Sequence, residues 1–291
     1  MSLRKILIVN ADDFGMNRAV TEGIINAFKN GIVRSTSLMV NMPETNRAAQ
    51  TAKKNESLEV GIHLNISEGF CVSPPEDVYL LVDKNGRFNF DVKNIPESMR
   101  IFRQLIETTP KILSQISLEF ENQINLFNQF DLKLSHINIH HYLSLLHQKL
   151  FEIYSKTAEK CGVPYRRMCS PMFELLNSSA NDKQTVADFS NSVSVSSPCL
   201  SISHLLDGTS LELSNEEYCE TMKSKINGFL RNNDLKCLEL IVHPTLENIS
   251  AANDDYATVK KIETSLVLNN DFANYLKRAE FEISGYSGLL L

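Results

Sequence analysis

Short apolar runs alternate with amphipathic stretches over the first 65 residues of the chain. Ile6–Val9, Ser35–Val40 and Leu58–Leu64 have the composition of buried strands, whereas Arg18–Lys29 and Glu44–Lys54 are typical of helices. This order indicates consecutive βα units, in which each helix returns the chain to the same end of the sheet and makes the strands parallel. We therefore expect an α/β protein with a mainly parallel sheet covered by helices.

The regular pattern stops over residues 66–110. Pro74-Pro75, Asn85-Gly86 and Pro96 mark turns in this stretch. Long irregular segments inside compact domains usually carry function or move. We expect an irregular insertion here, on the substrate side of the protein.

Regular elements return after residue 110. No internal repeat or change of composition marks a domain boundary, so we expect a single domain over residues 1–291. Residues 170–203 are rich in Ser and Asn and predict no clear element. The expected helices are Pro110–Phe130, Leu146–Cys161, Glu216–Asn232 and Tyr256–Leu268, and the expected strands are Leu132–Ile139 and Cys237–Val242.

The composition is that of an ordinary globular protein. A net charge of -6, from 29 Lys and Arg against 35 Asp and Glu, gives no basic excess that would indicate nucleic-acid binding. No apolar run approaches the roughly 20 residues of a membrane helix, and Lys5–Asn10 is too short for the apolar region of a signal peptide. We expect a cytoplasmic protein with no nucleic-acid or membrane partner.

Four of the predicted strands run directly into an acid or a histidine. Asp12 and Asp13 follow the first strand, and His63, His140 and His243 each follow a later one. The carboxyl ends of parallel strands lie on one face of the sheet, so these five side chains are expected to meet in one cleft. Each has a simpler explanation when taken alone, because an acid can cap the following helix and a single histidine is more often structural.

The segment Ser135–His141 holds the densest group of these residues. His136, Asn138 and His140 share one face of the predicted strand. At about 3.3 Å per residue, His136 and His140 lie roughly 13 Å apart, whereas two nitrogens on one zinc-like ion lie at most about 4.2 Å apart. Only one of the two histidines is therefore expected to be a direct ligand, and its place at the strand end favours His140.

Four motifs in this order resemble those of the YdjC-like carbohydrate deacetylases, the family of the chitooligosaccharide deacetylases. The motifs are Asn10–Gly15, Gly61–Asn65, Ser135–His141 and Val242–Pro244. The resemblance implies a distorted (β/α) barrel and a hydrolase that removes an N-acetyl group from an amino sugar or short oligosaccharide. The expected partner is thus a small carbohydrate substrate. A homodimer is compatible with the sequence, which does not determine the oligomeric state.

The resemblance also implies roles for individual residues. It implies one divalent metal ion, zinc or magnesium, held by Asp13, His63 and His140. Asp12 would be the general base, and His243 the general acid or an orienting group. Arg166 and Asn65 are the expected substrate-binding residues. Asn138 is expected to support a metal ligand from outside, and the strand spacing makes His136 either a supporting residue of the same kind or a structural one.

Three positions depart from the family pattern. The family usually has an acid where this chain has Asn138, and histidines where it has Tyr142 and Ser144. The loss of a charge at Asn138 weakens the support that an acid gives to a metal-bound histidine. Two alternatives therefore remain open: a metal- and sugar-binding protein without turnover, and a hydrolase that acts on another amide or ester.

Overall fold

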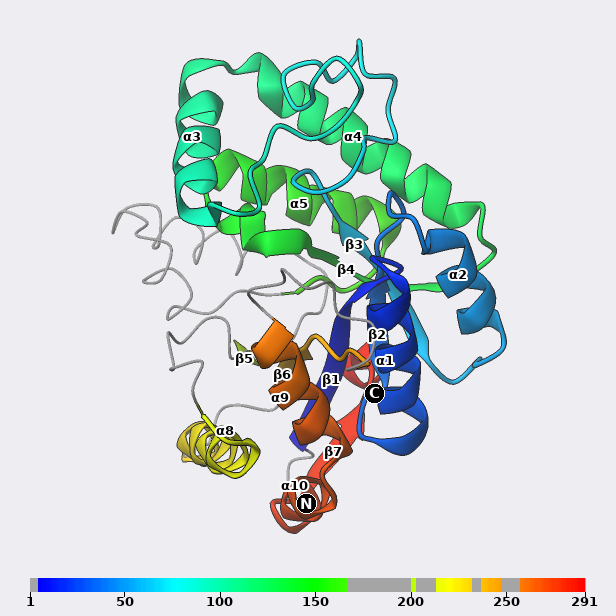
Figure 1. Ribbon diagram of the computed structural model, residues 1–291, viewed down its shortest axis with the longest axis vertical. Helices are drawn as coiled ribbons and strands as arrows, with labels where there is room; N and C mark the ends of the chain where they lie inside the picture. Colours follow the sequence, from blue (N-terminus) through cyan, green and yellow to red (C-terminus); the bar gives the residue numbers. More distant parts are fainter. Residues whose placement is uncertain (1–4, 167–199, 203–212, 232–236, 247–256, 291) are drawn as a thin grey trace.

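The described strands form one curved, parallel sheet with helices around it (Figure 1). The computed structural model describes residues 5–166, 200–202, 213–231, 237–246 and 257–290. The strand order is β4-β3-β2-β1-β6-β5, with β7 also paired to β1. The strands are β1 (Lys5–Phe14), β2 (Ser35–Leu38), β3 (Glu59–Leu64), β4 (Leu134–Ile139), β5 (Leu200–Ile202), β6 (Cys237–Val242) and β7 (Phe281–Ser284).

The helices follow the strands in the alternation that the sequence predicts, so the expected α/β fold, a distorted barrel of parallel strands, is confirmed. Helix α1 packs on β1, α2 on β2, α4 on β3 and α9 on β6. The helices are α1 (Arg18–Asn30), α2 (Thr45–Lys53), α3 (Ile95–Thr108), α4 (Lys111–Asn128), α5 (Gln148–Cys161), α8 (Asn215–Leu230), α9 (Ala257–Leu268) and α10 (Asn270–Arg278), with 3-10 helices η1 (His140–Leu145) and η4 (Tyr286–Leu290).

Strand β1 is the centre of the sheet and has three partners. One edge pairs with β6 from Ile6 to Ala11. The other edge is shared, because its first half, Lys5–Ile8, pairs with β7 and its second half with β2. The strand extends beyond the expected Ile6–Val9 and carries Asp12 and Asp13 at its end.

The expectation of irregular chain through residue 110 is wrong for its last part, which forms helix α3. The Asn94 side chain accepts a hydrogen bond from Glu97 N and caps this helix. Pro96 lies in the first turn, where a missing N–H breaks no helical hydrogen bond. This proline therefore marks the start of a helix, not a turn.

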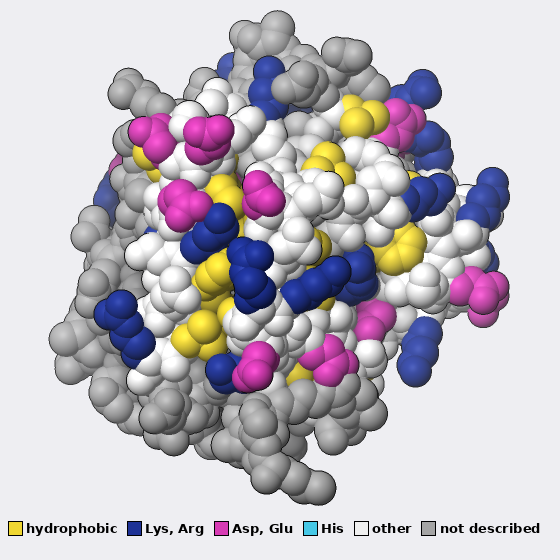
Figure 2. All heavy atoms as spheres, turned by 90° about the horizontal axis from the view of Figure 1, so that it is seen from below, with side chains coloured by type: hydrophobic (Ala, Val, Ile, Leu, Met, Phe, Trp, Pro, Cys, Tyr) yellow, Lys and Arg dark blue, Asp and Glu magenta, His cyan; other side chains and the backbone are white. Residues whose placement is uncertain are grey.

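The sequence pattern also missed α10 and β7, which are short. Asn269 caps α10 by accepting hydrogen bonds from Asp271 N and Phe272 N, and the chain then returns to the sheet as β7 beside β1. Figure 2 shows the end of the molecule where α10 lies, with Lys and Arg side chains interspersed with Asp and Glu. Within the described residues, no helix has the length and apolar character needed to cross a membrane.

Candidate active site

The end of β1 turns two neighbouring carboxylates toward different partners. Asp13 has a left-handed backbone, with φ of 69°, and the register with β2 shifts between Ala11 and Phe14. A regular strand would place neighbouring side chains on opposite faces, whereas this irregularity re-aims them. Asp12 contacts Arg166, and Asp13 contacts two histidines.

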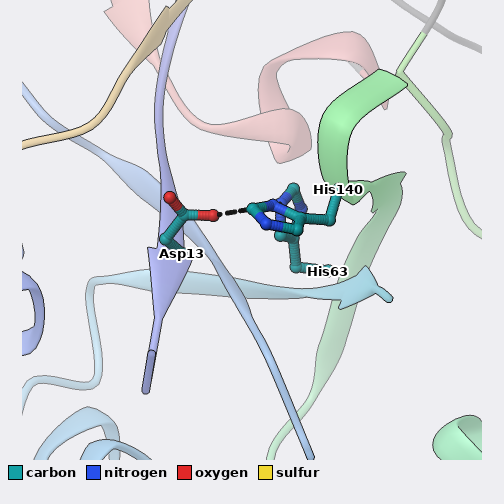
Figure 3. A group of neighbouring side chains, drawn as sticks. All are labelled: Asp13, His63 and His140. Carbon is teal, nitrogen blue, oxygen red and sulfur yellow. Dashed lines mark hydrogen bonds and ion pairs between the residues drawn. The ribbon is translucent and has the colours of Figure 1, made fainter. Parts of the chain in front are cut away.

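Asp13, His63 and His140 converge on one point from β1, β3 and the start of η1 (Figure 3). Asp13 Oδ1 lies 3.3 Å from His63 Nε2 and 3.2 Å from His140 Nδ1. The two imidazole nitrogens are 3.1 Å apart. All three side chains are buried.

This group fits a divalent cation. Donor atoms that share a zinc ion lie at most about 4.2 Å apart, and all three separations are within that limit. Asp13 Oδ1 is buried but accepts no hydrogen bond of good geometry from any described residue, which is costly for a carboxylate unless a cation contacts it. One carboxylate oxygen and two imidazole nitrogens suit zinc, and with water as additional ligands they also suit magnesium.

A hydrogen bond to Asn138 fixes which nitrogen of His63 faces Asp13 and His140. Asn138 Nδ2 donates to Asp12 Oδ1 at 3.1 Å, so Asn138 Oδ1 is the atom that faces His63 Nδ1, at 2.6 Å. His63 Nδ1 therefore carries the proton, and its Nε2 lone pair points to Asp13 and His140. Asn138 thus lies on the far side of the His63 ring from Asp13 and His140.

His140 has carboxylates on both sides of its ring. Its Nδ1 faces Asp13, and its Nε2 lies 3.2 Å from Glu68 Oε2. Burial alone would lower the pKa of His140, but the negative charges of Asp13 and Glu68 outweigh this effect and raise the pKa to about 10. In the absence of a cation, the protonated ring is therefore favoured.

Asp12 accepts five hydrogen bonds from side chains of the described residues. Arg166 donates from Nη1 to Oδ2 at 2.6 Å and from Nη2 to Oδ1 at 2.7 Å. Oδ1 also accepts from Asn10, Ser37 and Asn138. Burial would raise the pKa of Asp12, but the Arg166 guanidinium outweighs burial and holds the pKa far below its usual range. Asp12 is therefore ionised and fixed in orientation.

Arg166, which we expected to contact substrate, is completely buried. Besides Asp12, its guanidinium contacts Glu239, with Nε donating to both carboxylate oxygens at 3.1 and 3.2 Å. Tyr286 also donates to Glu239, at 2.7 Å. The structure thus places Arg166 between two buried acids, behind Asp12.

His243 lies on the other side of Asp12 and pairs with Glu263. Its Nδ1 is 3.0 Å from Glu263 Oε2, and its Nε2 is 4.0 Å from Asp12 Oδ2. Burial would lower the pKa of His243, but the carboxylate of Glu263, followed by those of Asp13 and Asp12, raises it. The protonated ring is thereby favoured, with Nε2 toward the site.

The structure places Asn65 and His136 outside the reacting group. Asn65 is buried, and its amide is used within the chain: Oδ1 accepts from Ser67 N and Glu68 N, and Nδ2 donates to Asn41 and to Glu68 O. His136 stacks on Tyr286 with ring centroids 3.8 Å apart. Among the described residues, His136 makes no hydrogen bond to the three candidate ligands.

Three acids of the site were missed by the sequence analysis: Glu68, Glu239 and Glu263. A signal existed for Glu239, because it is the one charged residue in the apolar strand Cys237–Val242. Glu68 lies on an irregular loop and Glu263 on a helix with charged neighbours. Nothing local distinguishes these two from solvent-exposed acids.

The fold and site define a class: a parallel α/β half-barrel with a candidate metal centre at the carboxyl edge of its sheet. The chain belongs to the YdjC-like family, whose model matches residues 6–278. The resemblance noted from the four motifs is thereby confirmed.

Several known proteins are similar to this chain in sequence or in structure. A carbohydrate deacetylase of Clostridium beijerinckii is 29% identical over 287 residues, which cover 97% of this chain and 99% of that protein. A carbohydrate deacetylase of Thermoanaerobacter pseudethanolicus is 36% identical over 162 residues, 56% of this chain and 60% of that one. A crystal structure described as a cellobiose-phosphate cleavage protein from Enterococcus faecalis V583 has a TM-score of 0.76 at 23% identity, covering 98% and 99% of the two chains, and so supports the fold.

Proposed function

We propose that this protein is a metal-dependent hydrolase that removes an N-acetyl group from an amino sugar or short oligosaccharide. The observation that carries the proposal is the convergence of Asp13, His63 and His140, with a buried carboxylate oxygen that lacks a hydrogen bond. Relatives that are named carbohydrate deacetylases, one of them similar over nearly its whole length, support the choice of reaction.

Asp13, His63 and His140 are the proposed metal ligands, and Asp12 is the proposed general base. A divalent ion held there would polarise the acetyl carbonyl and lower the pKa of a bound water molecule, so that a weakly basic carboxylate would suffice as proton acceptor. Asp12 meets this need because it is ionised. Among the described residues, its Oδ2 accepts one hydrogen bond, from Arg166, whereas Oδ1 accepts four. Oδ2 is therefore the proposed accepting atom.

His243 is the proposed general acid. Nδ1 donates to Glu263, which leaves Nε2 to deliver a proton to the leaving amine on the Asp12 side of the site. Arg166 and Glu263 are positioning residues in this scheme, because they act through Asp12 and His243.

The alternative of a binding protein without turnover is less well supported. A base and an acid, each held by a buried partner of opposite charge, are costly to retain in a protein that only binds sugar. A hydrolase of another amide or ester uses the same groups. Release of acetate from N-acetylglucosamine oligomers distinguishes these alternatives.

The base assignment is tested by Asp12→Asn. We expect acetate release from N-acetylglucosamine oligomers to fall about 10²- to 10⁴-fold, because the amide cannot accept the proton. Metal content, measured on the same preparation, is expected to persist. Asp77→Asn, an exposed acid of the insertion, is the matched control and should change neither quantity. Unchanged turnover in the Asp12 variant would remove the assignment.

A further inference from the structure

His140 and His63 reach the candidate metal centre through different ring atoms. His63 presents Nε2 to the centre, whereas His140 presents Nδ1. A neutral imidazole has a lone pair on only one nitrogen, so the group on the far side of each ring decides which atom can bind a metal. For His63 this group is the neutral amide of Asn138, and for His140 it is the carboxylate of Glu68.

Side-chain hydrogen bonds fix the backbone of the loop that carries Glu68. The Asn65 side chain accepts from Glu68 N at 3.0 Å and donates to Glu68 O at 2.6 Å. Asn41 Nδ2 also donates to Glu68 O, at 3.0 Å. The backbone of Asn65 is in turn bonded at both N and O by the buried side chain of Gln123 on α4. Both backbone groups of Glu68 are thus fixed, and the carboxylate is presented to His140.

We propose that Glu68 is a positioning residue that keeps the proton of His140 on Nε2 and so makes Nδ1 the metal-binding atom. A carboxylate only accepts hydrogen bonds, so His140 Nε2 must donate to Glu68. The Nδ1 lone pair then points toward Asp13 and His63. The inference rests on the proposed metal site but not on the identity of the substrate.

A competing role for Glu68, as a direct metal ligand, predicts a different number of bound metal ions. Glu68, His140 and His141 also offer ligand atoms within 4.8 Å of one another, so Glu68 as a direct ligand to a second ion is the competing assignment. That assignment requires two metal ions per chain, whereas a positioning role requires one.

The test compares zinc binding to the apoprotein in Glu68→Ala, Glu68→Gln and the wild type, by competition with a chromophoric chelator. Removal of such an outer partner is expected to weaken zinc affinity about 10- to 100-fold in Glu68→Ala. The glutamine oxygen can still accept from Nε2, so Glu68→Gln should restore most of the affinity. Glu76→Gln, an exposed acid of the same insertion, is the matched control and should bind zinc like the wild type.

Nitrogen-15 NMR of labelled histidine in the zinc-loaded protein supplies a readout independent of turnover. We expect His140 to show a protonated Nε2 and a zinc-bound Nδ1 in the wild type, and to lose this pattern in Glu68→Ala. An unchanged affinity and spectrum in Glu68→Ala would overturn the proposal, as would two zinc ions in the wild type and one in the variant. Absence of acetate release with these changes present would instead count against the proposed deacetylation alone.

Discussion

At the scale of single residues, the surroundings of Asp12 and Asp13 give adjacent carboxylates different roles. Both are buried, and both have pKa values held low by nearby positive charge. Arg166 satisfies Asp12 with two hydrogen bonds, whereas Asp13 faces two histidines with one oxygen that accepts none. The first arrangement fixes an anion in place, and the second leaves an anion that a metal ion can bind.

The pair of His243 and Glu263 predicts a specific change in the pH profile. Glu263 raises the pKa of His243, and an acid catalyst must be protonated, so activity is lost as pH rises through that raised value. Glu263→Gln removes the charge and lowers the pKa of His243. The alkaline limb of kcat/KM against pH is then expected to move to lower pH. A limb that stays in place would show that His243 is not the acid.

At the scale of elements, side chains on one face of α4 hydrogen-bond to the backbone of the irregular segment that follows β3. Gln115 accepts from Leu80 N, Glu119 accepts from Val72 N and Ser73 N, and Gln123 binds the backbone of residue 65. These three side chains are four residues apart and lie on one stripe of the helix. Because all are buried, they satisfy loop backbone groups that would otherwise be unpaired. A helix thus decides where an irregular loop lies over the site.

The pairing of β3 with β4 depends on a glycine. A Cβ at Gly61 would lie 2.4 Å from the His136 ring and 2.5 Å from the His136 carbonyl oxygen. Gly61→Ala must push the two strands apart and is expected to lower the free energy of unfolding by about 1–3 kcal/mol or more. Urea denaturation measures this change.

Gly228→Ala, on α8, is the matched control for that substitution. A Cβ there meets no atom within 4 Å, and alanine is the better helix former, so stability should be equal or higher by up to about 1 kcal/mol. Equal stability of the two alanine variants would contradict the close approach of β3 and β4.

At the scale of the whole molecule, the site gathers more buried negative than positive charge. Asp12 and Glu239 share the guanidinium of Arg166, Glu263 pairs with His243, and Asp13 faces His63 and His140, so four buried carboxylates meet one guanidinium and the raised-pKa rings of His140 and His243. The strand ends bring these charges together, and burial makes their imbalance costly. A divalent cation at Asp13 offsets this imbalance, so metal binding and folding are expected to be coupled.

This coupling predicts a metal-dependent melting temperature. At a free zinc concentration 100 times the Kd, the folded state gains about 2.7 kcal/mol, and the melting temperature should rise by about 5 °C and fall again with a chelator. His63→Ala lacks one ligand and should show little of this shift. Scanning calorimetry of both proteins, with and without zinc, measures the effect. An equal shift in the two would mean that zinc binds elsewhere.

Most of the sheet, and which residues lie at its carboxyl edge, could be predicted from local pattern. Apolar runs of strand length define β2, β3, β4 and β6, and parallel connection places the residues that follow them on one edge. Asp13, His63 and His140 were therefore predicted to meet, and the structure brings them together. Helix α3 was missed because Pro96 is compatible with both a turn and a helix start, and only the capped first turn distinguishes them.

Spacing along the chain is enough to predict the alternation of strands and helices and the acids and histidines at the strand ends. The hydrogen-bond partners of the site residues depend on the tertiary structure. Arg166 hydrogen-bonds to an acid 154 positions away, Asn65 hydrogen-bonds to the backbone of its own loop, and Glu68 lies within hydrogen-bond distance of His140. Side-chain direction at a strand end depends on one backbone angle, such as that of Asp13, and on contacts between distant segments. No periodicity in the sequence encodes either of these.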